Sequence, residues 1–172
     1  GEFTSRDGSY SVPDSHHFRT TDAAMNHGWL AGFILDSVLD MINPDHKISD
    51  VSYPDYILSI PDEVQGAAFI RDKIILSQSY GRNNDSRISI YQNPMNETSI
   101  NDATLDNGRS IPVWILEKEN LEREIMAPPM TEGIVEYKGS AAVLYESGSD
   151  KYRNSAKNPQ GRIHILTLIA DD

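Results

Sequence analysis

The chain contains an internal repeat, and this repeat limits the possible folds more than any other feature of its 172 residues. Residues 56–69 align without a gap with residues 123–136. The aligned stretches share a proline, an acidic or amide residue, and a glycine, which are Pro61 with Pro128, Gln65 with Glu132 and Gly66 with Gly133. Agreement of turn and strand residues over such a length indicates two copies of one structural unit.

Two further blocks extend the repeat. Residues 74–79 align with residues 142–147 after one inserted residue, which places Gln78 opposite Glu146. The last pair of blocks shares the pattern Arg-Ile-x-Ile and comprises residues 85–91 and 160–166. Short runs of β-branched residues separated by Gly, Pro, Asn and Asp are typical of strands. Each copy of the repeat is therefore predicted to form four strands joined by turns, which together make one sheet. Sheets of this kind, arranged around a common axis, build a β-propeller.

The whole pattern predicts an all-β protein with ten strands. We expect them near Trp29–Leu35, Tyr56–Ile60, Gln65–Ile70, Lys73–Ser79, Arg87–Tyr91, Val113–Glu117, Glu122–Ala127, Glu132–Tyr137, Ala141–Glu146 and Arg162–Leu168. The polar stretch Asn93–Ser110 predicts a surface loop. Residues 34–42 leave a second possibility open, because Ile34, Val38 and Ile42 fall on one face of a helix.

The strand count predicts about two and a half four-stranded blades of a single propeller domain. We expect a partial blade in residues 1–61, a blade in residues 62–128 and an incomplete blade in residues 129–172. In the partial blade, residues 27–33 and 56–60 supply the third and fourth strands. Open edges of apolar strands promote aggregation, so the missing strands must come from elsewhere. Three sources of the missing strands are open: another copy of this chain, sequence outside this chain, or an N-terminal partner chain left by cleavage before Gly1. We expect the last, which makes this chain the C-terminal part of the propeller.

The unit over residues 62–91 resembles an NHL-type propeller repeat. The similarity lies in the Gly-Ala-Ala strand start, the apolar strand ending Ser-Gln-Ser, the Gly-Arg-Asn-Asn loop and the Arg-Ile-Ser-Ile strand. The Glu132-Gly133 pair is similar to the Glu-Gly at the first strand of gluconolactonase and regucalcin-like blades. The resemblance implies a propeller that holds a ligand over its central tunnel. It supports a fold more than an activity, because such propellers serve lactonases, lyases, scaffolds and ligand binders.

The resemblance also implies which residues face the ligand. They are Glu2, Gln65, Gln78, Glu132 and Glu146, together with the loop that bears His16, His17 and His27. Glu2, Glu132 and Glu146 recur at repeat-equivalent positions and offer oxygen ligands for Ca²⁺ or another divalent ion. The alternative is a polar lining of a water-filled tunnel without a metal.

Two loop clusters offer further chemistry. His16, His17 and His27 can supply a general base or hold Zn²⁺, with Asp14 and Asp22 available to orient them. Lys151 and Arg153 can clamp an anionic ligand at the same face. Each cluster can equally be a solvated polar loop.

Composition narrows the classes of function. A net charge of −11 argues against binding a nucleic-acid backbone, and the absence of cysteine excludes thiolate chemistry and disulfides. No apolar run approaches the ~20 residues that cross a membrane. From the repeat and the NHL-type resemblance we expect a secreted propeller that binds a small molecule, and two classes of function remain open. One is a metal-assisted hydrolase or lactonase, and the other is a non-enzymatic scaffold that binds a ligand or a protein.

Overall fold

The computed structural model describes residues 11–34 and 52–168. The expected helix-or-strand segment beyond residue 34 and the segment around Glu2 lie outside these residues. The described chain is all-β, with short 3-10 turns between its strands. The strands are β1 Phe18–Arg19, β2 Met25–Asn26, β3 Gly28–Gly32, β4 Tyr56–Ile60, β5 Val64–Ile70, β6 Lys73–Gln78, β7 Ser86–Gln92, β8 Asn101–Thr104, β9 Ser110–Ile115, β10 Leu121–Ala127, β11 Thr131–Tyr137, β12 Ser140–Tyr145 and β13 His164–Leu166.

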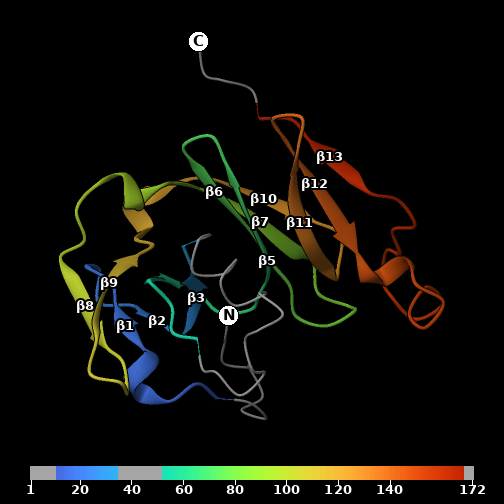
Figure 1. The fold of residues 1–172 in the computed structure, drawn as a ribbon. Helices are drawn as coiled ribbons and strands as arrows, with labels where there is room; N and C mark the ends of the chain where they lie inside the picture. Colours follow the sequence, from blue (N-terminus) through green and yellow to red (C-terminus); the bar gives the residue numbers. More distant parts are fainter. Residues whose placement is uncertain (1–10, 35–51, 169–172) are drawn as a thin grey trace, which may run out of the picture.

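The strands form four sheets, and within the described residues none of these sheets closes on itself. The middle sheet has the order β5-β6-β7-β10, with every neighbour antiparallel. The third sheet has the order β11-β12-β13. The first sheet has the order β3-β4-β9-β8, and β1 pairs with β2 alone. Figure 1 shows β11, β12 and β13 in orange and red beside the green strands β5, β6 and β7, with β8 and β9 on the other side.

Two hydrophobic cores hold the sheets face to face. One core joins the middle and third sheets and contains Ile75, Ile90, Ile134 and Val143. The other joins the first and middle sheets and contains Leu58, Ile74 and Leu76. The middle sheet is therefore covered on both faces, which explains why β6 has three consecutive apolar residues, Ile74, Ile75 and Leu76, and is buried from Ile74 to Gln78.

The repeat is visible in the register of the middle and third sheets. Val64 pairs with Gln78 and Thr131 pairs with Tyr145, and each pair is followed by a bulge. Positive φ values occur in non-glycine residues at matching places, namely Glu63 with Met130 and Arg71 with Lys138. The turns and bulges thus recur as well as the strands, and these features fix the register of both hairpins.

This register corrects the expected alignment by one residue. Gln78 and Tyr145 occupy matching positions, and Glu146 matches Ser79. The expected one-residue insertion before the second strand is therefore wrong. The alignment of Arg-Ile-Ser-Ile with Arg-Ile-His-Ile agrees with the register, because Ile90 and Ile165 both lie opposite the second strand of their sheet at matching places.

The prediction of a loop over Asn93–Ser110 is wrong. This stretch contains the 3-10 turn η2 (Pro94–Asn96) and strand β8, which pairs with β9. Strand β9 then runs parallel to β4, with Val113 opposite Ile57. The segment between β7 and β10 therefore leaves the middle sheet and adds a hairpin to the outer edge of the first sheet.

Candidate functional site

The register of β3 and β4 brings together a histidine and an aspartate that are far apart in sequence. Gly28 pairs with Ile60, so His27, just before β3, lies beside the turn after β4. The Nδ1 atom of His27 is 2.6 Å from Oδ2 of Asp62. Both side chains are about one third exposed, which leaves them accessible to a ligand.

His17 adds a second imidazole to this pair. The rings of His17 and His27 meet edge to face, with centroids 4.5 Å apart. The Nε2 atom of His17 is 3.0 Å from the carbonyl oxygen of Val12. His17 and His27 each point one ring nitrogen at an oxygen acceptor, an arrangement that fixes the ring orientation. We define His17, His27 and Asp62 as the imidazole cluster.

The other members of the expected histidine group have different roles. His16 packs edge to face on Trp29, whose Nε1–H donates to Nδ1 of His16 at 3.3 Å. Asp22 accepts a hydrogen bond from Thr20 instead of orienting a histidine. The exposed Asp14 lies 3.7 Å from His17. The orienting carboxylate in the structure is Asp62, which the sequence reasoning missed.

Glu132 and Glu146 lie side by side at the start of β11 and the end of β12. Burial of Glu132 raises the pKa of its carboxyl group, and the neighbouring Glu146 raises it further by charge repulsion and by a hydrogen bond. The two residues border a pocket of about 390 Å³ that Ser149 and Arg162 also line. We call Glu132 and Glu146 the carboxylate pair.

The glutamines of the middle sheet differ in availability. Gln78 is buried, donates to the carbonyl oxygen of Asp62 at 2.9 Å and accepts from the Ser89 hydroxyl at 3.1 Å. Its amide is thus engaged in holding the turn that carries Asp62. Gln65 is exposed, and its amide lies 3.5 Å from the carbonyl oxygen of Ser79.

Lys151 and Arg153 are engaged within their own loop. The ammonium group of Lys151 lies 4.6 Å from the centre of the Tyr152 ring. Arg153 is paired with Asp150 at 2.9 Å and donates to the carbonyl oxygen of Gly148. An anion clamp from these two side chains would require both to leave these partners.

The described candidate residues share one end of the sheets. At this end β3, β5 and β11 begin and β4, β6 and β12 end, and we call it the strand-start end. The starts of β5 and β11 are adjacent, because a Cβ atom on Gly66 would lie 2.5 Å from the carbonyl oxygen of Glu132. The Ser77 hydroxyl at the end of β6 donates to the same oxygen at 2.8 Å. The imidazole cluster, Gln65, Gln78 and the carboxylate pair all lie here. Lys151 and Arg153 lie in the loop after β12 and the 3-10 turn η4 (Glu146–Gly148).

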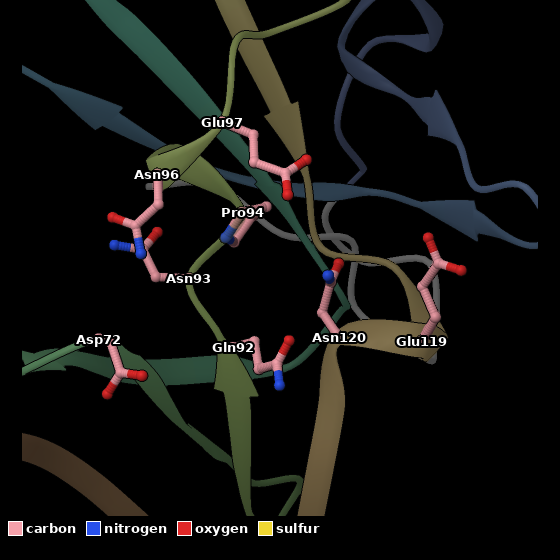
Figure 2. A pocket seen from close by; sticks show the side chains of 8 residues that line it. All are labelled: Asp72, Gln92, Asn93, Pro94, Asn96, Glu97, Glu119 and Asn120. Atoms are coloured by element: carbon pink, nitrogen blue, oxygen red, sulfur yellow. The ribbon is translucent and has the colours of Figure 1, made fainter.

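A larger pocket lies at the opposite end of the middle sheet. It has a volume of about 590 Å³ and is lined by amides and carboxylates around Gln92 and Asn120. Figure 2 shows the carboxylates of Asp72, Glu97 and Glu119 on separate sides of this hollow. Because these carboxylates are spread around the pocket, their charges do not converge on one point. We therefore place the candidate site at the strand-start end, although the pocket there is smaller.

The donor groups only partly fit the calcium site that the resemblance implies. Within residues 11–34 and 52–168, no three His, Asp or Glu side chains gather in a way that could hold a metal ion. Glu132 and Glu146 supply two carboxylates, whereas Ca²⁺ takes six to eight oxygen ligands. Glu2, the third expected ligand, is outside the described residues.

Comparisons with known proteins add no identification. No family model, no curated protein and no solved structure matches this chain. In the part of the chain that the structure describes, no helix has the length and apolar character needed to cross a membrane.

Proposed function

We propose that this chain is part of a β-propeller and that its strand-start end binds a small molecule. The observation that carries the proposal is the gathering of the candidate polar residues at one end, although they come from separate segments. The face-to-face stacking of the sheets, and the register that the middle and third sheets share, support the propeller. Loops at the end of a rigid β-scaffold are a usual place for a ligand site.

The carboxylate pair favours a ligand with a positive charge. Burial and the adjacent Glu146 raise the pKa of Glu132, so ionising both groups is unfavourable in the absence of a cation. An ammonium group or a divalent cation placed between them would offset this repulsion. The nearby pocket of about 390 Å³ provides space for a small organic molecule.

Thermal unfolding with two probes, Ca²⁺ and the diamine cadaverine, tests the binding. We expect at least one probe to raise the melting temperature in a saturable way. The response should be lost in Glu132→Gln and Glu146→Gln and retained in the exposed control Glu119→Gln. Absence of a saturable response to both probes would contradict a cation-binding site here.

A hydrolase is the second candidate, favoured by the hydrogen bond between His27 and Asp62. With Nδ1 directed at the carboxylate, Nε2 is the ring nitrogen that can take a proton from water. No step is assigned to a metal, because the described residues supply only part of a ligand set. Hydrolysis of δ-valerolactone tests this candidate, with a loss of roughly a hundredfold expected in His27→Gln. Equal rates in the wild type and His27→Gln would exclude His27 as the base.

The secreted location and the N-terminal partner chain stay predictions. Analysis of the intact mass of the protein in its natural complex tests the partner directly. A second polypeptide carrying the same repeat would support the two-chain propeller.

A further inference from the structure

The third sheet presents an apolar face to solvent. Val135, Ala142 and Ile165 are cross-strand neighbours, so their side chains lie on the same face. Tyr137 and Leu144 lie two residues after Val135 and Ala142, and Ile163 lies two residues before Ile165, so these three side chains lie on the same face. Five of these six are at least half exposed, and they make up half of the ten exposed large hydrophobic residues in the described chain. We call these six residues the open face.

The matching face of the middle sheet is buried. In the register of the repeat, the open face corresponds to Ala68, Ile70, Ile75, Ser77, Ile88 and Ile90. These residues are 7 % exposed or less. Strands β11 and β12 cover them with the side chains of Ile134, Ala141 and Val143. The same surface is therefore covered in one repeat and uncovered in the next.

Two glycines mark where the covering strand sits. A Cβ atom on Gly66 would lie 2.5 Å from the carbonyl oxygen of Glu132 and 2.8 Å from the amide nitrogen of Ile134. Gly66 is thus required by the close approach of the β11 backbone. Gly133 occupies the matching place on the third sheet, yet a Cβ there would meet only Leu144, at 3.9 Å. The third sheet therefore has a glycine at the place where a strand could approach closely, but no strand of the described residues lies there.

We infer that the open face docks the first two strands of a further sheet of the same repeat, carried by a separate polypeptide. This inference rests on the proposed propeller. The incoming strands would place a backbone carbonyl at Gly133 and apolar side chains on Val135, Leu144 and Ile165, as β11 and β12 do on the middle sheet. The occupant is thus a β-strand pair with alternating apolar residues.

A second copy of this chain fits less well than a separate polypeptide. The strand faces that have the required shape are those bearing Ala67, Ile74 and Leu76, or Ile134, Ala141 and Val143. Both already lie in a core of this chain. A second copy would have to open one of its own cores to offer either of them.

Docking would also complete the candidate site. Leu144 and Ile163 belong to the open face and line the pocket beside the carboxylate pair. A strand placed over Gly133 would close one side of this pocket and add its own residues to it. The ligand would then be held between two polypeptides.

Site-specific photo-crosslinking in the natural source tests the inference. A benzoylphenylalanine at position 144 or 165 should crosslink to one other polypeptide, within a strand that belongs to the same repeat pattern. The same probe at position 69 or 126, which are exposed hydrophobic positions off the open face, should not. A crosslink from position 144 to a second copy, to another part of this chain, or to no protein would overturn the inference.

Gly133→Val provides a second test, in which a loss of complex formation can be told apart from a loss of folding. The variant should retain the melting temperature of the isolated chain, because a Cβ atom at this position would meet only Leu144, at an ordinary contact distance of 3.9 Å. It should weaken formation of the complex at least tenfold. Unchanged assembly in Gly133→Val overturns the docking mode. A complex that assembles as described and binds neither probe contradicts the ligand site alone, so the two failures are distinguishable.

Discussion

The Nδ1 atom of His27 lies 2.6 Å from Oδ2 of Asp62, across a separation of 35 residues. The contact exists because β3 and β4 pair with Gly28 opposite Ile60. The Gln78 side chain holds the Asp62 turn from the neighbouring sheet by donating to its carbonyl oxygen. The imidazole is therefore oriented by groups from two sheets, which is a suitable arrangement for a side chain that binds a ligand or moves a proton.

Asp62→Asn should release the orientation of the His27 ring. The carboxylate favours the tautomer with hydrogen on Nδ1, and an amide can accept or donate, so we expect a mixture of tautomers in the variant. ¹⁵N NMR of the imidazole nitrogens at pH 8 measures this. We also expect the free energy of unfolding to fall by about 1 kcal/mol through loss of the hydrogen bond.

Asp14→Asn is the matched control, because Asp14 is fully exposed and 3.7 Å from His17. It should change neither the tautomer of His27 nor the stability. A single, unchanged tautomer in Asp62→Asn would show that Asp62 does not orient the ring.

Glu132→Gln should raise stability at neutral pH. Burial and the neighbouring Glu146 raise the pKa of Glu132, so the folded protein holds this proton more tightly than the unfolded chain does. Its stabilising contribution is full below the ordinary glutamate pKa and is lost as the pH rises through the raised value. We expect the variant to be more stable than the wild type at pH 7 by about 0.5 kcal/mol, as for like charges on adjacent strands.

Urea unfolding at pH 4 and pH 7 measures this difference, which should shrink at the lower pH. Glu119→Gln, an exposed position in η3 (Lys118–Asn120), controls for the change in net charge. A wild type that is the more stable protein at pH 7 would contradict the repulsion between Glu132 and Glu146.

The repeat allowed much of the fold to be predicted from sequence. Alternating apolar residues between turn residues correctly located the strands of the middle and third sheets. It also correctly indicated that residues 27–33 and 56–60 form neighbouring strands. The positions of these strands depend on the local sequence pattern. Because the pattern occurs twice, the strand assignment in one copy supports the assignment in the other.

The hairpin of β8 and β9 could not be predicted in the same way. Strand β8 has the sequence Asn-Asp-Ala-Thr and alternates between half-buried and exposed residues at a sheet edge, so it carries almost no apolar signal. Its partner β9 joins β4 in parallel, which is a pairing between segments more than 50 residues apart. Only tertiary packing decides such a pairing.

The sequence analysis named the histidines and glutamates of the candidate site, which are His17, His27, Glu132 and Glu146. It did not name the aspartate, Asp62. Asp62 follows a proline in a turn, where aspartate is common for reasons of backbone conformation alone. Its role comes from the β3–β4 register, which the sequence does not display. The one-residue error at Glu146 has a similar origin, because hairpin register is set by the turn conformations at Arg71 and Lys138.

Gly66→Ala should destabilise the protein, whereas Gly133→Ala should not. The new Cβ atom at position 66 would press against the backbone of β11 at 2.5 Å, and backbone cannot move aside as a flexible side chain does. We expect a loss of about 2 kcal/mol, in the range of overpacked cores. At position 133 the nearest atom is at 3.9 Å, so a change within about 0.5 kcal/mol is expected.

Urea unfolding of both variants in the isolated chain checks this contrast. Equal losses at the two positions would indicate that the face at Gly133 is covered in solution. Equal tolerance at both would mean that β5 and β11 are not in close contact.

Thr131→Val should stabilise the protein. The Thr131 side chain is fully buried at the start of β11, and its hydroxyl finds no hydrogen-bond partner among the described residues. The matching position in the middle sheet is Val64, so the repeat itself accepts valine there. Valine has nearly the same shape and removes a buried polar group, and we expect a gain of about 1 kcal/mol in the free energy of unfolding.

Ser77→Ala is the opposite case and serves as the control. The Ser77 hydroxyl is also fully buried, but it donates to the carbonyl oxygen of Glu132 across the interface between two sheets. Its removal leaves that oxygen with one bond fewer, so we expect a loss of about 1 kcal/mol. Unfolding in urea should therefore move the two midpoints in opposite directions. A loss of stability in Thr131→Val would mean that its hydroxyl has a partner after all, and a bound water or a residue outside the described ranges would then have to supply it.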